Sequence, residues 1–264
     1  MLPDAGSQKI SSMLRETGLT IAELCAGMAS GTQCATVLEK TWKGLFGEQI
    51  RLETKLVSEM VPYKMEVCKD VCAKCMSQPK FIQQTGHEAK DLNPCGTDIA
   101  VVAIECDDVS RLSSTQRSIL DESGKSGASF LQTVAYLEHL PFERRPKIVI
   151  AECVSALGKM KQQFQERGTT VVCDKLLDIG YTGCFHELKS ARFFLPQSRG
   201  RVYGIFKKMS SFGQNAREAV LKQVDERLVF YSLDRSLCHL LSAFFCLVLK
   251  LTADSEDLEF CSQM

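Results

Sequence analysis

Short apolar runs alternate with amphipathic stretches along most of the chain. Apolar or alternating runs predict strands, and apolar positions at helical spacing predict helices. The expected strands lie within residues 19–27, 49–60, 98–105, 146–153, 182–190 and 200–208. The expected helices lie at about 31–42, 61–75, 127–140 and within 155–180. This alternation favours an α/β fold with a doubly wound, mostly parallel sheet.

Three of the expected strands end in residues that can carry chemistry. The first strand leads into Cys25-Ala26-Gly27, the apolar run 99–104 leads into Glu105-Cys106, and the fourth strand contains Glu152. In a doubly wound sheet, ligands bind outside the carboxyl ends of the strands. We therefore expect these residues to line one crevice.

Composition and charge narrow the class of protein. The 264 residues include 45% hydrophobic and 24% charged residues, as in ordinary globular proteins. The formal net charge is zero, so any binding of nucleic acid would depend on a local basic patch. The first residues lack the apolar segment of a secretory signal peptide. The 13 cysteines are therefore expected to be reduced thiols in the nucleus or cytoplasm.

The pattern changes after Met209 and indicates three regions. We expect an N-terminal extension over residues 1–17, a main domain over 18–208 and a helical segment with an acidic tail over 209–264. The most apolar tract, 237–251, contains a histidine and a lysine and is too short for a membrane span. It is expected to form a helix that is buried or that docks a protein partner.

Five blocks of the main domain, in this order, resemble the cytosine-5 DNA methyltransferase family. The most specific is the last, which contains a Pro-Gln-x-Arg-x-Arg pattern at residues 196–201. The resemblance implies the S-adenosylmethionine-dependent (Rossmann-like) methyltransferase fold and methyl transfer to carbon 5 of cytosine in nucleic acid, with DNA favoured and tRNA left open. The target base would have to be flipped out of the duplex. The blocks are AELCAGMASG (22–31), LVSEMVPYKMEVC (56–68), DIAVVAIECDDVS (98–110), PKIVIAECVSAL (146–157) and the stretch 176–206.

The resemblance assigns catalytic roles to four residues. Carbon 5 of cytosine is a poor nucleophile, and a thiolate that adds to carbon 6 makes it reactive enough to accept a methyl group. Cys106 takes the place of this nucleophile. Glu152 takes the place of the carboxyl group that stabilises the ring nitrogen. Arg199 and Arg201 match the paired arginines that organise the glutamate and hold the base.

The resemblance also implies S-adenosylmethionine as the cofactor. Gly27 would let the backbone turn sharply and approach the ligand. Glu59 would bind the ribose hydroxyls, as an acid does in dinucleotide sites. Met60 stands where an adenine-stacking residue is common, and Asp91 is a candidate for the acid near the adenine amino group. The complete set of implied cofactor residues is Cys25, Ala26, Gly27, Met28, Glu59, Met60, Asp91 and Glu105.

The chain departs from the family pattern around these residues. Pro-Cys-Gln is replaced by Glu105-Cys106-Asp107, and Glu-Asn-Val is replaced by residues 152–154. Ala29 and Ser30 stand where glycines are usual. The two flanking carboxylates are expected to raise the pKa of the Cys106 thiol, which predicts weak activity or none. No segment after the arginine block matches a target-recognition domain or the last family motifs, so a divergent or inactive member is expected.

Two other classes of protein are compatible with parts of the sequence. A non-catalytic methyltransferase-fold scaffold would bind cofactor, nucleic acid or a catalytic partner. The C-x3-C-x2-C spacing of Cys68, Cys72 and Cys75 also occurs in radical S-adenosylmethionine enzymes, which hold a [4Fe–4S] cluster. The same positions mark one face of a helix, which favours packing. A zinc site from Cys72, Cys75, His87 and Cys95 fits no standard spacing.

Overall fold

The computed structural model describes residues 18–47, 49–83, 96–110, 113–114, 116–161, 166–189 and 200–209. The expected N-terminal extension and the apolar tract 237–251 lie outside the described residues.

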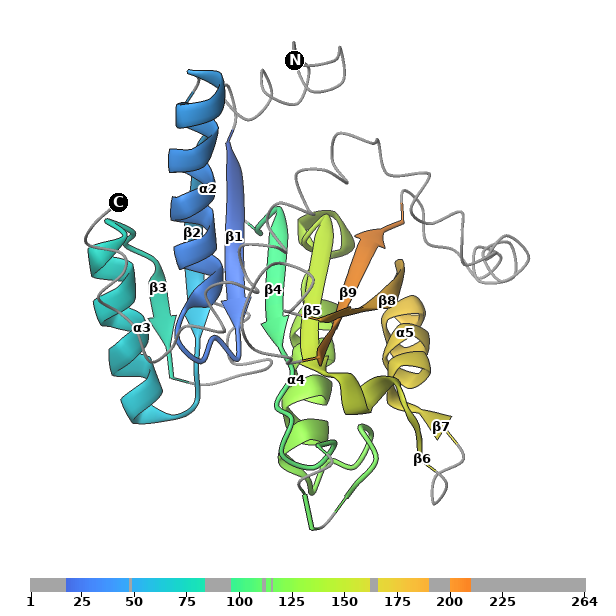
Figure 1. Ribbon diagram of the computed structural model, residues 1–264. Helices are drawn as coiled ribbons and strands as arrows, with labels where there is room; N and C mark the ends of the chain where they lie inside the picture. Colours follow the sequence, from blue (N-terminus) through green and yellow to red (C-terminus); the bar gives the residue numbers. More distant parts are fainter. Residues whose placement is uncertain are drawn as a thin grey trace.

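Seven strands form one sheet in the order β3-β2-β1-β4-β5-β9-β8 (Figure 1). β9 runs antiparallel to both of its neighbours, and the other strand pairs are parallel. The predicted mostly parallel α/β sheet is confirmed. The strands are β1 (Leu19–Leu24), β2 (Leu52–Ser58), β3 (Lys80–Ile82), β4 (Ile99–Ala103), β5 (Ile148–Val154), β8 (Tyr181–Lys189) and β9 (Gly200–Lys208).

Helices cover both faces of the sheet, as the doubly wound prediction requires. The longer helices are α2 (Ser30–Phe46), α3 (Pro62–Lys74), α4 (Lys125–His139) and α5 (Gly168–Asp178). Two short 3-10 helices, η2 (Phe142–Arg144) and η3 (Ser155–Gly158), flank β5. None of the described helices combines the length and the hydrophobicity that a membrane crossing requires.

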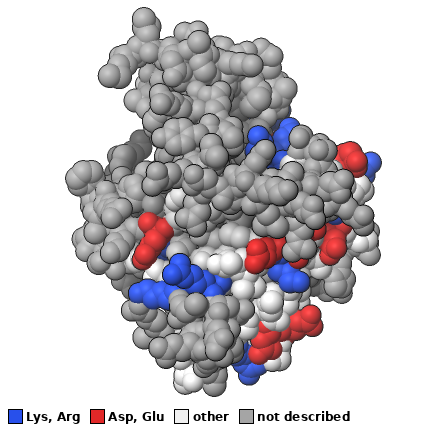
Figure 2. Space-filling view, turned by 90° about the vertical axis from the view of Figure 1, so that its right-hand side faces the viewer, with Lys and Arg blue, Asp and Glu red and all other residues white. Residues whose placement is uncertain are grey.

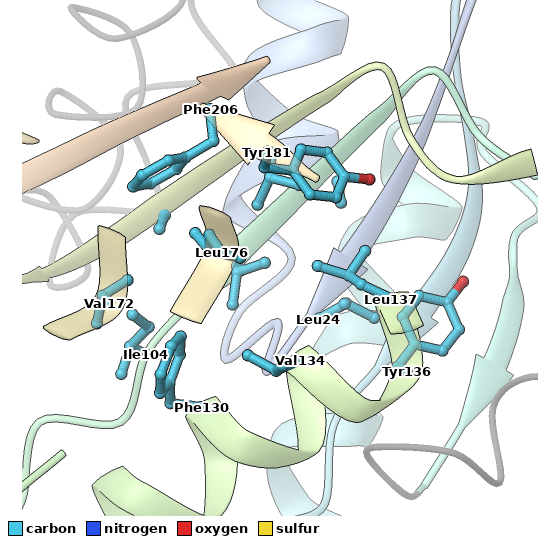
Figure 3. Packing of buried hydrophobic residues seen from close by; sticks show 14 of the residues in the cluster. Leu24, Ile104, Phe130, Val134, Tyr136, Leu137, Val172, Leu176, Tyr181 and Phe206 are labelled. Carbon is cyan, nitrogen blue, oxygen red and sulfur yellow. The ribbon is translucent and has the colours of Figure 1, made fainter. Parts of the chain in front are cut away.

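The largest buried cluster lies between the sheet and the helices α4 and α5. Phe130, Val134 and Leu137 of α4 pack with Val172 and Leu176 of α5 in this cluster (Figure 3). Successive residues of a strand point to opposite faces. The cluster accordingly takes alternate residues of the central strands, including Ala22, Leu24, Ala100, Val102, Val149 and Ala151.

The other face of the sheet is covered by α2 and α3. Ile21 of β1 packs with Leu38 of α2, and Val57 of β2 packs with Met65 of α3. Each of these strand residues adjoins a residue that belongs to the α4 cluster, as the two-residue period predicts. The continuous apolar run of β4 arises because this strand is buried on both faces, with Ala100 and Val102 in the α4 cluster and Ile99 in the α2 cluster.

Three short strands were not predicted. β3 has only three residues, and its first residue, Lys80, is exposed. β6 (Met160–Lys161) and β7 (Glu166–Arg167) form a separate antiparallel pair of two residues each. Strands this short are stabilised by their pairing partners and have too few residues to show a period.

The cysteines of the C-x3-C-x2-C stretch are packing residues. Cys68 and Cys72 are fully buried in the cluster between α3 and the sheet, and Cys75 is the half-buried residue that ends α3. The prediction of a helix with packed cysteines is confirmed. His87 and Cys95 lie outside the described residues. In the part of the chain that the structure describes, no three His, Cys, Asp or Glu side chains are grouped so that they could hold a metal ion.

A buried carboxyl group, which the sequence analysis did not single out, holds the start of α2. Ala29 precedes the helix and has no side chain that could cap it. Instead Glu23, which is 2% exposed on β1, accepts hydrogen bonds from the backbone N–H groups of Gly31 (3.0 Å) and Thr32 (2.5 Å). The Thr32 hydroxyl donates to the same carboxyl group. These bonds satisfy donors that every helix leaves unpaired in its first turn. Burial raises the pKa of Glu23 above its ordinary 4.5, although the three hydrogen bonds oppose the shift.

We predict that Glu23→Gln lowers the free energy of unfolding by about 1–3 kcal/mol, because the amide NH₂ would face a backbone N–H that loses its acceptor. Folded Glu23 takes up a proton at a higher pH than the unfolded chain does. Wild type therefore gains stability over the variant as the pH falls from the raised pKa toward 4.5. Urea titrations of both proteins across that range test this, with the exposed Glu66→Gln as control. A difference in the free energy of unfolding between wild type and Glu23→Gln that stays constant with pH would contradict the prediction.

Candidate active site

The ends of β4 and β5 bring the predicted nucleophile and the predicted catalytic acid to one edge of the sheet. Ala103 lies opposite Glu152 in the parallel ladder, and the N–H of Ile104 donates to the carbonyl of Glu152 over 2.9 Å. Cys106 follows two residues later and is half-buried against the α4 cluster. Because β1 pairs with β4 on the other side, the glycine loop after β1 adjoins the same edge (Figure 1). The three strand ends therefore share one edge of the sheet, as expected.

The third catalytic candidate pairs directly with the second. Arg201 lies opposite Val154 in the antiparallel β5–β9 ladder. Its Nε lies 2.7 Å from Oε1 of Glu152, with only 15% of the arginine and 22% of the glutamate side chain exposed. A charge-assisted bond of this length fixes the orientation of the carboxylate. The other predicted arginine, Arg199, lies outside the described residues.

The Cys106 thiol has a pKa above its ordinary value of 9.0. Burial is the largest cause. The Arg201 guanidinium opposes the shift, and the carboxylates of Glu105, Asp107 and Glu152 add to it. The predicted direction and the predicted contribution of the flanking acids are therefore confirmed, but burial is the larger cause. The flanking acids contribute less than the removal of the thiol from water.

The loop after β1 has a left-handed backbone at three positions. Gly27 has a φ of 59°, and the non-glycine residues Cys25 and Ala29 have φ values of 53° and 52°. Non-glycine residues in this region are uncommon and cluster at functional sites. A Cβ placed on Gly27 would have no atom within 4 Å, so this part of the loop faces open space. A ligand could approach the backbone there.

Gly27 is held from both sides by buried side chains. Its N–H donates to Oε2 of Glu59 over 2.8 Å, and its carbonyl accepts a bond from the Cys68 thiol over 3.4 Å. Glu59 is 3% exposed and also accepts the N–H of Val61 over 2.9 Å. The carboxylate thus joins the turn after β1 to the turn after β2. A carboxylate has about four lone-pair positions, so two N–H donors leave acceptor capacity for ligand hydroxyls.

The other predicted cofactor residues surround this loop. Met28 and Met60 expose 37% and 58% of their surface, which is high for large apolar side chains. Ala26 is buried, and its N–H donates to the carbonyl of Ser58 over 3.0 Å. Burial raises the pKa of the Cys25 thiol to about 12, with further contributions from nearby carboxylates. The remaining candidate, Asp91, lies outside the described residues.

Three residues of the site were missed by the sequence analysis of function. Glu23 holds the helix that follows the glycine loop, Cys68 bonds to Gly27, and Lys64 of α3 lies 3.4 Å from Glu105. The position of Glu23 inside a buried strand could have indicated its role, because an acid is almost never fully buried without hydrogen-bond or ion-pair partners. A lysine or cysteine on a helix gives no comparable signal.

A polar cavity of about 360 Å³ lies away from this edge of the sheet, between the start of β2, one side of α2 and the end of α3. None of the predicted site residues lines it.

The sheet order, the helices on both faces and the strand-end crevice define a methyltransferase-type α/β domain. Within that class, the family model for C-5 cytosine-specific DNA methylase matches residues 66–229, which is more than half of the chain. The chain belongs to this family. The matched region contains Cys106, Glu152, Arg199 and Arg201, whereas the glycine loop and Glu59 precede it.

Solved structures with a related fold include two Dnmt2 proteins. The Schizosaccharomyces pombe Dnmt2 methyltransferase is 20% identical, with 74% of this chain and 50% of that chain covered and a TM-score of 0.47. A Spodoptera frugiperda DNMT2 mutant is 18% identical, with 74% of this chain and 52% of that chain covered and a TM-score of 0.47. A methyltransferase from Pyrococcus furiosus is 15% identical, with 76% and 81% covered and a TM-score of 0.43.

The chain spans about half the length of the two Dnmt2 structures. Identities this low do not support a transfer of function residue by residue. No curated protein sequence matches the chain.

We predict that Glu59→Gln lowers the affinity for S-adenosylmethionine at least about tenfold, which corresponds to about 1.4 kcal/mol. The amide would present its NH₂ to the N–H of Gly27 or Val61, so one side of the loop would lose its acceptor. Isothermal titration calorimetry on both proteins measures the change. Glu66→Gln on the exposed side of α3 is the matched control. An affinity equal to that of wild type would remove Glu59 from the cofactor site.

Proposed function

We propose that this chain transfers a methyl group from S-adenosylmethionine to carbon 5 of cytosine in nucleic acid, with DNA favoured over tRNA. The observation that supports this most is the grouping of Cys106, Glu152 and Arg201 at adjacent strand ends. All three lie inside the region that matches the family model. In this proposal Cys106 is the nucleophile, Glu152 the catalytic acid and Arg201 the residue that orients it.

The residues around the glycine loop fit the cofactor. Gly27 offers an open backbone face, Glu59 offers acceptor capacity beside it, and the exposed Met28 and Met60 offer apolar surface for an aromatic ring. When bound, S-adenosylmethionine supplies the electrophilic methyl group. Glu105, at the end of β4, would line the opposite side of the crevice. Cys25 and Ala26 complete the turn.

The proposed reaction follows from the positions of the side chains. The Cys106 thiol loses its proton, and its sulfur forms a bond to carbon 6 of the flipped base. The electron pair of the 5,6 double bond moves into the ring, which makes carbon 5 nucleophilic. Glu152, held by Arg201 and protonated when the base is bound, would donate a hydrogen bond to the ring nitrogen on which negative charge develops. After methylation, the proton on carbon 5 is lost to solvent, its electron pair re-forms the 5,6 double bond, and the sulfur–carbon bond breaks. The sulfur leaves as the thiolate, which takes up a proton from solvent.

The charge on the described surface fits contact with nucleic acid through small groups of side chains. Figure 2 shows the side of the molecule that carries α5 and β8, where basic side chains lie in short groups beside acidic ones. The zero net charge of the whole chain agrees with this mixture. Affinity would then come from a few phosphate contacts, with a modest salt dependence.

A second candidate function is a non-catalytic scaffold, and one observation favours it. The raised pKa of Cys106 leaves little of the reactive thiolate at neutral pH. In this alternative the domain binds cofactor, nucleic acid or a catalytic partner, with the tract 237–251 as a docking helix. In either case we place the protein in the nucleus or cytoplasm.

We predict that oligonucleotides with 5-fluorocytosine form a covalent complex with the protein in the presence of S-adenosylmethionine. The fluorine at carbon 5 cannot leave as the proton does, so the adduct persists. Because the pKa of Cys106 lies above 9.0, the trapped fraction should rise toward alkaline pH. Denaturing gel electrophoresis and peptide mass spectrometry measure the complex. Cys106→Ala should abolish it, and Cys173→Ala on α5 should leave it unchanged.

The same experiment separates the two candidates. A cofactor-bound protein that traps neither DNA nor tRNA at any pH would support the scaffold and contradict the catalytic proposal. Trapping on tRNA alone would correct the substrate.

A further inference from the structure

We propose that Lys64 and Lys125 are positioning residues of the Cys106 loop, because each pairs with one of the two carboxylates that flank the thiol. The inference rests on the proposed role of Cys106 as the nucleophile. In this inference α3 and α4 stabilise the loop around Cys106. Glu105 and Asp107 stand in this loop in place of the family's proline and glutamine.

The first pair joins α3 to the residue before Cys106. Nζ of Lys64 lies 3.4 Å from Oε1 of Glu105, and the two side chains are 29% and 33% exposed. The backbone of Glu105 is fixed as well, because its N–H donates to the hydroxyl of Ser129 over 3.3 Å. A proline at position 105 would restrict this backbone through its ring. Here an ion pair and a hydrogen bond to two different helices restrict it.

The second pair joins the first residue of α4 to the residue after Cys106. Nζ of Lys125 lies 2.8 Å from Oδ2 of Asp107, with exposed fractions of 76% and 49%. Asp108 continues this connection, since its Oδ2 accepts the N–H of Ser126 over 2.8 Å and its own N–H donates to the Ser126 hydroxyl over 3.0 Å. The loop after Cys106 is therefore tied to the start of α4 by both charge and backbone.

Together with Arg201 and Glu152, the thiol is surrounded by three ion pairs. Their three cations come from α3, α4 and β9, and their three carboxylates come from the loop and β5. The charged groups that affect the thiol are thus Glu105 and Asp107 on its own loop, Glu152 on β5 and Arg201 on β9. Lys64 and Lys125 pair with the first two of these carboxylates, so we expect them to act on the thiol through those carboxylates.

The two lysines are not equivalent. An exposed pair such as Lys125–Asp107 is screened by solvent and contributes little. The Lys64–Glu105 pair is more buried, and Lys64 also reaches the cofactor side of the crevice. There it opposes the effect of Glu59 and Glu105 on the thiol of Cys25, whose pKa is raised chiefly by burial. We therefore expect Lys64 to have the larger effect on Cys106.

The experiment measures the alkylation of Cys106 by iodoacetamide in the full chain between pH 7 and 10, resolved by peptide mass spectrometry. Alkylation requires the thiolate, so its rate reports the thiol pKa without any methyl transfer. Lys64→Gln should slow the reaction of Cys106 about three- to tenfold at neutral pH and shift the profile to higher pH. Lys125→Gln should slow it less than about twofold. Lys69→Gln, which breaks the exposed pair with Glu66 on the same helix, is the matched control.

Two further variants separate charge from fold. Lys64→Arg keeps the charge and should keep the wild-type rate. The double variant Lys64→Gln with Glu105→Gln removes both charges and should return to within about twofold of wild type. Glu105→Gln alone removes a carboxylate that raises the pKa of the Cys106 thiol, so it should react faster than wild type. This last variant tests the proposal even where Lys64→Gln does not fold.

A Lys64→Gln rate equal to that of wild type would overturn the proposal. So would a loss that the added Glu105→Gln does not recover, because Lys64 would then act through the fold and not through the carboxylate. The outcome is independent of the catalytic proposal. If the alkylation pattern is as expected while 5-fluorocytosine traps no complex, the lysines position the thiol and the methyl-transfer function alone is wrong.

Discussion

The parallel register of β1, β4 and β5 is the constraint on which the rest of the molecule depends. These strands are buried on both faces, so a shift by one residue would turn every apolar side chain toward the wrong layer. With the register fixed, Ala103 lies beside Glu152 and the chain leaves β4 at a defined point. Cys106 and the glycine loop then lie at the same edge of the sheet, because each follows the carboxyl end of a parallel strand. The packing of the core therefore determines where Cys106, Glu152 and the glycine loop lie.

Two buried carboxylates stabilise the glycine loop and the start of α2 through hydrogen bonds to the backbone. Glu23 holds the first turn of α2, and Glu59 holds Gly27. Both carboxylates accept hydrogen bonds from backbone N–H groups of this part of the chain. Without these acceptors the N–H groups would be buried and unpaired. The non-glycine residues Cys25 and Ala29 keep their unfavourable backbone because these bonds determine the path of the chain. The loop is thus held by one acid on the strand that precedes it, Glu23, and by one acid on the next strand of the chain, Glu59.

The sequence was sufficient to predict the central sheet, the order of its helices and the strand ends that share one edge. Each of these depends on long apolar patterns or on strand ends, which are local features. It was not sufficient for β3, whose three residues are stabilised by pairing with β2. It also did not indicate Lys64 or Cys68 as parts of the site, because their roles depend on distances to Glu105 and Gly27. Such contacts arise from the tertiary fold and leave no trace in spacing.

The electrostatics of the site explain how an acidic loop around Cys106 can persist. A lone carboxylate beside a half-buried thiol would raise the pKa of that thiol and would itself require solvation. Here three acids meet three cations drawn from α3, α4 and β9, so charge is balanced within the crevice. The remaining obstacle to thiolate formation is burial, which is the largest cause of the raised pKa of Cys106. In the proposed reaction, a flipped base would add to the burial of the sulfur by displacing solvent from it. The reactivity of Cys106 therefore depends more on what covers it than on its two acidic neighbours.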